Sequence, residues 1–354
     1  MSSHVLRHGR TRAVISVSLV LTLAACQAAA APSSSTPVPS EAPSTAATQV
    51  PSVAPDPTVR LPDHVVAQWS IDNPSFIAFA FGSVWVPNHY GNEITRIDPA
   101  TNTIQAVIKG TGNNPESALE VGGALWVTGQ HDDMVLIDPV TNAVVKTVPG
   151  DHLFMDAGFG SVWTTTRDNH VERFDPATAT IVSTIPVGEG SSDCMNGVVG
   201  RAASVWVFQC DRGELIRIDP VTSRVTSTTS FATLVKEAKA ATGTLAATAT
   251  DSIWLEVGGG DLPTGLMRVS TITGDGLSFL PLTPELQGDG ELAVSDDAVW
   301  LGGSEEYSRV DIATGKIVAT YPTDPGRLKL GVAFGSVWLR NFEQGLIQRL
   351  DVAP

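Results

Sequence analysis

The sequence contains few basic residues. It has 22 Lys and Arg against 37 Asp and Glu among 354 residues, which gives a formal net charge of −15. Proteins that bind nucleic acid through a general basic surface need the opposite balance, because an acidic domain repels the phosphate backbone. The composition therefore argues against nucleic acid as a partner. It argues equally against binding to anionic lipid headgroups through surface charge.

The apolar run near the N-terminus is too short to cross a membrane. The uncharged stretch from Ala13 to Ala25 has about thirteen residues, whereas a membrane-spanning helix needs roughly twenty. Arg7, Arg10 and Arg12 precede this stretch, and it contains no acidic residue. A short apolar run after positive residues is typical of a secretory signal. We predict that residues 1–25 direct export and are then removed.

Cysteine is scarce, with three residues in the chain. The first ends the segment Leu23-Ala24-Ala25-Cys26, which resembles the bacterial lipobox. The resemblance implies that Cys26 is diacylated on sulfur and anchors the protein outside the cytoplasm; an ordinary cleavage site beside an unrelated cysteine is the alternative. Cys194 and Cys210 then remain in an oxidising compartment, and we predict a disulfide between them.

Large apolar side chains are nearly absent from residue 27 to about residue 60, where Ala, Pro, Ser and Thr predominate. Such a segment cannot bury enough apolar surface to fold, and its prolines favour an extended chain. We predict that residues 26–60 form a lipidated, disordered stalk below a domain at 61–354. Removal of residues 1–25 takes away three arginines and no acid, which leaves 19 basic against 37 acidic residues and a net charge of −18.

Tryptophan marks a repeat in the rest of the chain. The successive spacings are 41, 37, 43, 48, 46 and 38 residues, and each copy lies in a short segment of small and apolar residues. The copies are Trp85, Trp126, Trp163, Trp206, Trp254, Trp300 and Trp338. A period of this length is typical of propeller blades.

A second signature follows most of these tryptophans by about a dozen residues. Its fullest form is Arg-Ile-Asp-Pro, and the fifth copy has Ser270 in place of the aspartate. The other copies lie at residues 96–99, 136–139, 173–176, 217–220, 309–311 and 349–351. We expect the repeated Arg and Asp to form contacts between blades or within turns, and the tryptophans to form the core.

Each unit has the pattern of four short strands, because apolar residues alternate between turn residues. The strands expected in the first unit are Phe76 to Phe81, Ser83 to Asn88, Glu93 to Asp98 and Thr103 to Lys109. In the turn at residues 98–102, Pro fits its fixed φ and the Asp carboxylate can accept hydrogen bonds from the following amides. The chain therefore predicts an all-β fold, a seven-bladed β-propeller of four-stranded blades.

The last unit ends after three strands, and Val65 to Ile71 has the alternation of the missing fourth. We predict that this N-terminal strand completes the last blade. Pairing of the two strands would also cover edges that otherwise promote aggregation.

The Gly-Ser-Val-Trp-Val and Arg-Ile-Asp-Pro-Ala-Thr repeats, over roughly residues 62–354, resemble those of YncE-like and YVTN-type bacterial propellers and of the virginiamycin B lyase group. These families place binding proteins and a lyase on one scaffold. The lyases, as the family implies, use histidine with magnesium-binding glutamates to open a cyclic antibiotic. Apart from a displaced Glu256, this chain has neutral residues where those acids would stand: Asn88, Gly129, Thr166, Gln209, Val257, Gly303 and Asn341.

Other enzyme patterns find less support. Ala313-Thr314-Gly315-Lys316 resembles a turn of quinoprotein propellers, but those repeats place tryptophan after the turn, and no full set of cofactor ligands is visible. The sequence has no nucleophile elbow, no His-Glu-x-x-His and no phosphate-binding glycine loop. No catalytic residue is assigned on this basis.

One face of the ring should gather the loops between blades and the turns between second and third strands. The residues expected on this face are polar and suit hydrogen bonding to a ligand. The candidate binding residues are Asn73, Asn88, His89, Asn114, Gln130, His131, His152, Arg167, His170, Asp193, Gln209, Arg212, Glu256, Glu305, Arg327 and Arg340.

Histidine is concentrated on this face in the first three blades. The four copies are His89, His131, His152 and His170. Because imidazole is the commonest transition-metal ligand, one hypothesis is a divalent metal or general-base site with Asp132, Asp133 or Asp168 as partners. The alternative is that polar loops collect histidine without forming a site, since the spacing defines no ligand geometry.

An insert at Thr233 to Thr242, between the fourth and fifth blades, resembles a short helix. Long connections are often functional, so it either covers part of the polar face or is padding. Taken together, the sequence favours a noncatalytic, membrane-anchored, monomeric binding or scaffold propeller for a small molecule, glycan or envelope protein. The alternative is a metal-assisted lyase or hydrolase of the virginiamycin B lyase type.

Overall fold

The computed structural model describes residues 64–351 except 131–132, 189–194, 210–211, 232–239, 248–250, 260–261, 283–291 and 296. The predicted signal, stalk and Cys26, and the predicted Cys194–Cys210 pair, lie outside these residues. The described part of the chain is built of strands, and none of it forms a helix that is long and apolar enough to span a membrane.

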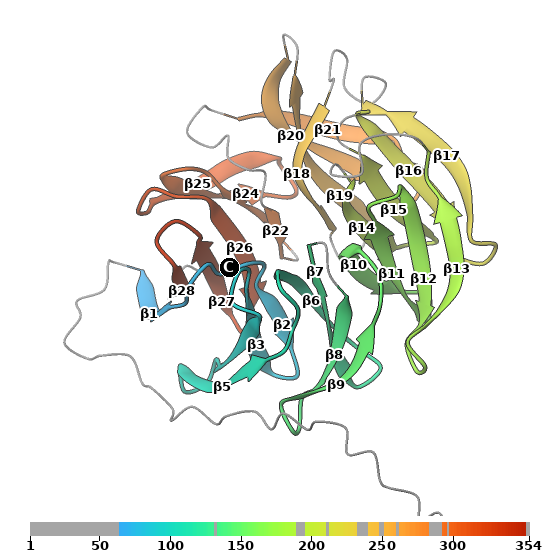
Figure 1. Ribbon diagram of the computed structural model, residues 1–354. Coiled ribbons are helices and arrows are strands. Elements are labelled where there is room, and N and C mark those ends of the chain that lie inside the picture. The colour runs from blue at the N-terminus through green and yellow to red at the C-terminus, as the bar shows by residue number, and fades with distance from the viewer. Residues whose placement is uncertain are drawn as a thin grey trace, which may run out of the picture. The chain divides into compact units, whose positions relative to one another are not determined.

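The strands form seven antiparallel sheets of four strands each, arranged as a ring of blades (Figure 1). Blades 1 to 3 contain β2 (Ala78–Ala80), β3 (Ser83–Asn88), β4 (Glu93–Asp98), β5 (Thr103–Lys109); β6 (Pro115–Val121), β7 (Ala124–Gly129), β8 (Met134–Asp138), β9 (Ala143–Val148); β10 (His152–Gly158), β11 (Ser161–Thr166), β12 (His170–Asp175) and β13 (Thr180–Pro186). The first strands of neighbouring blades contact one another around the centre of the ring.

The remaining blades continue the same order along the chain. Blades 4 to 6 contain β14 (Met195–Arg201), β15 (Ser204–Gln209), β16 (Glu214–Asp219), β17 (Arg224–Ser230); β18 (Ala240–Ala247), β19 (Ser252–Gly259), β20 (Leu262–Ser270), β21 (Gly276–Pro281); β22 (Leu292–Val294), β23 (Ala298–Gly302), β24 (Glu306–Asp311) and β25 (Lys316–Pro322). Blade 7 contains β26 (Leu328–Ala333), β27 (Ser336–Asn341), β28 (Leu346–Leu350) and β1 (Val65–Ser70). The predicted seven-bladed propeller is confirmed.

Ring closure follows the prediction. β1 pairs antiparallel with β28, and Asp351 N donates to His64 O at 2.8 Å beyond the end of that pair. Trp69 of β1 stacks on Trp338, the repeated tryptophan of blade 7, with ring centroids 5.6 Å apart. Strands from the two ends of the described chain therefore share one blade and one core.

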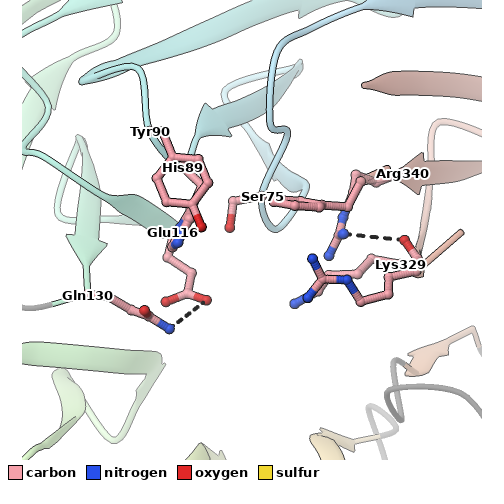
Figure 2. A pocket seen from close by; sticks show the side chains of 9 residues that line it. Ser75, His89, Tyr90, Glu116, Gln130, Lys329 and Arg340 are labelled. Atoms are coloured by element: carbon pink, nitrogen blue, oxygen red, sulfur yellow. Dashed lines mark hydrogen bonds between the residues drawn. The ribbon is translucent and has the colours of Figure 1, made fainter. Parts of the chain in front are cut away.

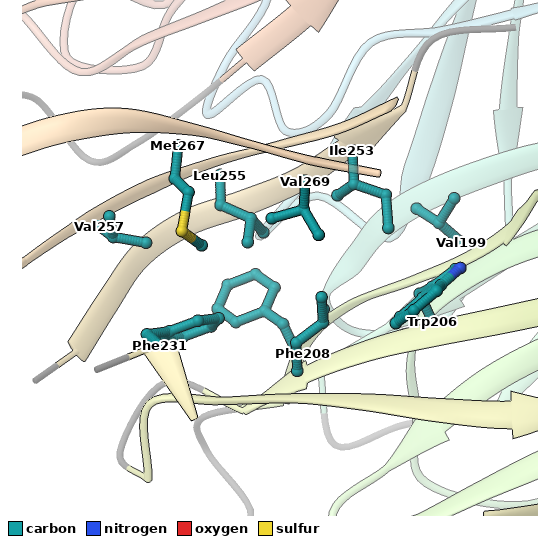
Figure 3. Packing of buried hydrophobic residues seen from close by; sticks show 10 residues of the cluster. Val199, Trp206, Phe208, Phe231, Ile253, Leu255, Val257, Met267 and Val269 are labelled. Carbon is teal, nitrogen blue, oxygen red and sulfur yellow. The ribbon is translucent and has the colours of Figure 1, made fainter. Parts of the chain in front are cut away.

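The space between neighbouring blades is filled by apolar side chains. Figure 3 shows the layer between blades 4 and 5, where Trp206 and Phe208 face Ile253, Leu255 and neighbours on the next sheet. All seven repeated tryptophans are at most 1% exposed. Because burial of large aromatic side chains dominates core energetics, these residues are part of the scaffold, as the repeat predicted.

In blades 1, 3, 5 and 7 the repeated arginine of the third strand donates to the main chain of the next blade. In blade 1, Arg96 Nε donates to Ser83 Oγ at 2.9 Å, and Nη1 donates to Pro139 O of blade 2 at 2.6 Å. In blade 7, Arg349 Nη1 donates to Pro99 O of blade 1. The same contact thus links adjacent blades and closes the ring, which confirms the structural interpretation of this residue.

Blade 2 has Leu136 at the position of this arginine, and a lysine on its outer strand takes over the link. Lys146 Nζ donates to the main-chain oxygens of Thr178 and Ala179 in blade 3, at 3.2 Å for Ala179. Lys146 therefore supplies the contact between blades 2 and 3 that the arginine supplies in other blades.

Two local differences from the sequence expectation concern inner strands. β2 begins at Ala78 rather than Phe76, because Phe76 N donates out of its own sheet to Glu116 O of blade 2 at 3.1 Å. β18 begins at Ala240, so residues 240–242 belong to a strand and not to the expected helical insert. Residues 232–239 of that insert lie outside the described chain.

Candidate functional site

A cavity of about 330 Å³ lies where blades 7, 1 and 2 meet. It is bounded by residues at the starts of the inner strands and by residues that end or follow the second strands. Its lining residues are Ser75, His89, Tyr90, Glu116, Gln130, Arg327, Lys329, Arg340 and Phe342. Four of the predicted binding residues, His89, Gln130, Arg327 and Arg340, are among them.

The propeller topology positions these residues through one repeated backbone contact. The residue after the second strand donates its N–H to a carbonyl of the preceding inter-blade loop. This contact joins His89 N to Asn73 O at 2.9 Å, Gln130 N to Asn114 O at 3.0 Å, and Phe342 N to Arg327 O at 3.2 Å. Asn73 and Asn114, both predicted binding residues, therefore hold the loops that form the cavity.

Three cations form one wall of the cavity. Arg327 ends the loop before the inner strand of blade 7, and Lys329 lies in that strand as the cross-strand partner of Arg340. Arg340 is 3% exposed, and its Nη1 donates to Arg327 O at 3.3 Å. Arg327 also forms an ion pair with Glu343, with Nε 2.6 Å from Oε1.

Aromatic rings lie against all of these cations. Lys329 Nζ is 2.9 Å from the ring centroid of Phe76. The guanidinium carbons of Arg327 and Arg340 are 4.5 and 5.4 Å from the ring centroid of Phe342. Cation–π contacts of this kind favour the charged side chain and limit its movement.

The pKa of His89 reflects the charge of this wall. Burial lowers the pKa of His89 below its ordinary value, and the positive charges of Lys329, Arg340 and Arg327 lower it further. Each cation disfavours a second positive charge nearby. The electrostatic potential at the imidazole is therefore positive.

The opposite wall carries a carboxylate. Glu116 Oε1 lies 3.5 Å from Gln130 Nε2, and both side chains come from blade 2. Figure 2 shows these two residues on one side of the cavity and Lys329 and Arg340 on the other, with Ser75 between them. The cavity is thus charged with opposite signs at its two sides.

Two buried asparagines shape the loops at the cavity. Asn88 is 6% exposed, and its Oδ1 accepts a hydrogen bond from Tyr90 N at 3.2 Å. Asn341 is 2% exposed, and its Nδ2 donates to Asp324 O at 3.1 Å. Both side chains bind loop backbone.

The predicted residues of blade 3 lie apart from the cavity lining. His152 is 1% exposed, and its Nε2 lies 3.0 Å from Glu172 Oε2. His170 Nδ1 lies 3.1 Å from Asp168 Oδ1. Each histidine has its own carboxylate partner, and neither shares that partner with His89.

Four further predicted residues come from blades 2, 3 and 4, and two of them form ion pairs. Arg167 pairs with Asp151 at 3.2 Å. Arg212 pairs with Glu214 at 2.8 Å. His131 and Asp193 lie outside the described residues.

Three further predicted residues lie on blades 4, 5 and 6. Gln209 is fully buried, and its Nε2 donates to Asn169 Oδ1 at 3.2 Å. Glu256 is 2% exposed, whereas Glu305 is exposed. None of these three lines the cavity.

No group of three His, Cys, Asp or Glu side chains within the described part of the chain is placed to hold a metal ion. The described candidates His89, His152 and His170 stand in three separate environments. The metal hypothesis for residues 131 and 132 falls outside the described residues and stays a prediction.

Sequence reasoning did not include Ser75, Glu116, Lys329 and Phe342 among the candidates, although they line the cavity. The available signal was positional. Glu116 and Lys329 stand within the first two residues of inner strands, directly after the inter-blade loops that were considered. Extending the candidate set by two residues into each inner strand would have found both.

Comparison with known proteins gives matches at the level of fold. No family model and no curated protein matches the sequence. A hydrazine synthase structure from Kuenenia stuttgartiensis matches with a TM-score of 0.68 at 13% identity, covering 80% of this chain and 96% of that chain. Virginiamycin B lyase from Staphylococcus aureus matches with a TM-score of 0.65 at 14% identity, covering 80% and 98%.

BamB from Moraxella catarrhalis also matches, with a TM-score of 0.58 at 15% identity, covering 86% of this chain and 97% of that chain. At these identities the similarity establishes only the architecture, and function has to be inferred from the residues of the site. The chain is a seven-bladed β-propeller that shares its fold with virginiamycin B lyase and with propellers of other functions.

Proposed function

We propose that the protein is a noncatalytic binding propeller, anchored outside the cytoplasm through Cys26, that holds a small molecule in the cavity between blades 7, 1 and 2. The observation that carries this proposal is the cavity itself. Its volume of about 330 Å³ falls at the lower end of the range of ligand pockets in proteins. Its lining combines two aromatic rings with charged and hydrogen-bonding side chains from three blades.

The anchor and the stalk support a position at the cell surface. The lipobox-like segment ending at Cys26 and the Pro-rich residues 27–60 would hold the propeller away from the membrane. A propeller on such a stalk can present its loop face to soluble molecules or to partner proteins of the envelope.

The arrangement gives less support to a metal-assisted lyase. His152 and His170 contact different carboxylates, and the positions of the lyase acids carry neutral side chains such as Asn88 and Asn341. These two asparagines bind loop backbone, a role that keeps their side chains occupied.

A ligand screen with the full chain in detergent tests the proposed function. Thermal unfolding is followed with a library of sugars, cell-wall fragments, organic acids, amino acids and divalent metals, and metal content is measured on the same sample. We expect a small molecule to raise the unfolding temperature, because binding to the folded state alone stabilises it. Gln130→Trp should remove the effect by filling the cavity.

Lys316→Met is the control, because Lys316 is exposed at the start of β25 and is not part of the cavity lining. A bound metal at one equivalent that is lost on substitution of a histidine would favour the lyase instead. A ligand whose effect persists unchanged in Gln130→Trp would place the binding site elsewhere and overturn the proposal.

A further inference from the structure

We infer that the cavity between blades 7, 1 and 2 binds a zwitterionic small molecule, with its anionic group at Arg327, Lys329 and Arg340 and its ammonium group at Glu116. This inference rests on the proposed function and specifies the chemistry of the ligand. Carboxylate and phosphate share the anionic chemistry, and the test below separates them.

The cationic wall is unusual for this protein. The predicted mature chain carries 19 basic and 37 acidic residues, yet three basic side chains from β26, β27 and the loop before β26 line a single cavity. Their charges lower the pKa of His89 on the neighbouring blade. Long-range attraction of an anion by the whole protein is thus unfavourable, and recognition has to come from this local cluster.

Burial strengthens the attraction at the site. Arg340 is 3% exposed although it lines the cavity. Interactions between charges are stronger in partly buried surroundings than in water, because solvent screens them less. A guanidinium also presents several donors in a planar fork that matches carboxylate and phosphate oxygens.

The cations are held in position before a ligand arrives. Lys329 lies over Phe76, and Arg327 and Arg340 lie over Phe342. Arg327 is further fixed by its ion pair with Glu343. Side chains that are already ordered lose little conformational entropy on binding, which favours affinity.

Glu116 favours a ligand that carries a hydrogen-bond donor at the end opposite its anionic group. An ionised carboxylate offers only hydrogen-bond acceptors on its two oxygens. A ligand with an anion at each end would place a negative charge against Glu116. A ligand with an ammonium group there forms a charge-assisted hydrogen bond, which is stronger than a neutral one.

A series of ω-amino acids tests the inference directly. The probes are β-alanine, 4-aminobutyrate, 5-aminopentanoate and 6-aminohexanoate, each with its N-acetyl and carboxamide derivatives, and the corresponding aminoalkyl phosphates. Binding to the full chain is measured by isothermal titration calorimetry. We expect one chain length to bind best, and loss of either charge from that compound to weaken binding about tenfold or more.

Two substitutions test which side of the cavity binds each charged group of the ligand. Lys329→Met should weaken every anionic probe, whereas Glu116→Gln should weaken the free amino compound and leave its N-acetyl derivative unchanged. Lys316→Met and Asp275→Asn are matched controls on exposed residues away from the cavity. A preference between the carboxylate and phosphate series identifies the anionic group.

Equal binding of the free amino and N-acetyl compounds would overturn the zwitterion and leave an anion site. Failure of every anionic probe would also overturn the inference. The proposed function would survive that result if a neutral molecule binds and Gln130→Trp abolishes its binding, so the two proposals fail separately.

Discussion

Lys329 lies directly opposite Arg340 in the antiparallel pair of β26 and β27. Like charges at directly opposed positions destabilise a sheet, and neither side chain is fully exposed. The pair therefore places two positive charges next to each other on one wall of the cavity.

Lys329→Met should stabilise the protein in the absence of ligand. The substitution removes the repulsion from Arg340, and Met retains a favourable contact with the ring of Phe76. We expect the free energy of unfolding to rise by about 0.2–1 kcal/mol, measured by urea denaturation. Lys316→Met, on an exposed position of β25, should change it by less. A loss of stability in Lys329→Met would show that its contact with Phe76 outweighs the repulsion.

His89 should titrate below the ordinary pH range of histidine and respond to an anion. Burial and the charges of Lys329, Arg340 and Arg327 lower its pKa. A bound anion offsets those charges, so the pKa of His89 should rise on binding, and affinity should increase as the pH falls from the bound-state pKa towards the lower pKa of the free protein. The imidazole proton signals in NMR spectra, with and without ligand, measure the change.

The sign for stability follows from the same shift. Because the folded pKa lies below the unfolded value of about 6.5, the unfolded state takes up the proton first. His89 therefore lowers stability as the pH falls from the unfolded value through the folded one. Lys329→Met should raise the pKa of His89 in the folded state. An unchanged pKa in this variant would remove the argument that the lysine charge reaches the imidazole.

The ring could be predicted from the sequence because its signals are local and repeated. Each blade carries a tryptophan in its second strand, and most carry an aspartate turn after the third, so seven independent copies agree. The closing strand could be predicted as well, because the alternation of Val65 to Ile71 has no other place in such a ring. Consistency of this kind across levels specifies a fold.

The cavity could be predicted only in part. Its loops follow from topology, which placed His89, Gln130, Arg327 and Arg340 on the correct face. Local sequence does not show whether a side chain points into the cavity or into the interior of its blade. His152 was expected on the same face, but the first residue of β10 turns into the blade and meets Glu172. Burial of that kind depends on contacts between strands that sequence spacing does not reveal.

Arg349 should contribute more to stability than an exposed arginine because its contacts close the ring. It donates to Ser336 Oγ at 2.9 Å within blade 7, and to Pro99 O and Asn102 Oδ1 in blade 1. Hydrogen bonds from a charged donor each contribute about 1.5–3 kcal/mol. We expect Arg349→Gln to lower the free energy of unfolding by about 2 kcal/mol or more, measured by urea denaturation.

Arg224→Gln is the control for this substitution, because Arg224 is exposed at the start of the outer strand β17. It should change stability by less than about 0.5 kcal/mol. Equal effects of the two substitutions would mean that closure rests on the β1–β28 pairing and the core alone.

The aspartate turns should make stability fall in acid. Backbone N–H donation holds the pKa of Asp98, Asp138, Asp175 and Asp219 below the usual value. Carboxylates with lowered folded pKa stabilise the protein above the unfolded value of about 3.9, and this contribution is lost as the pH falls through the folded values. Urea denaturation between pH 5 and pH 2 measures the dependence.

Blade 5 provides the matched variant, because its turn has serine in place of aspartate. Ser270 Oγ accepts hydrogen bonds from Ile272 N at 3.2 Å and Thr273 N at 3.3 Å, as the carboxylate does elsewhere but without a charge. The double variant Asp175→Ser and Asp219→Ser should therefore keep its turns and lose part of the acid dependence. If the dependence stays as steep as in the unaltered protein, other carboxylates control acid unfolding and the turn aspartates act through geometry alone.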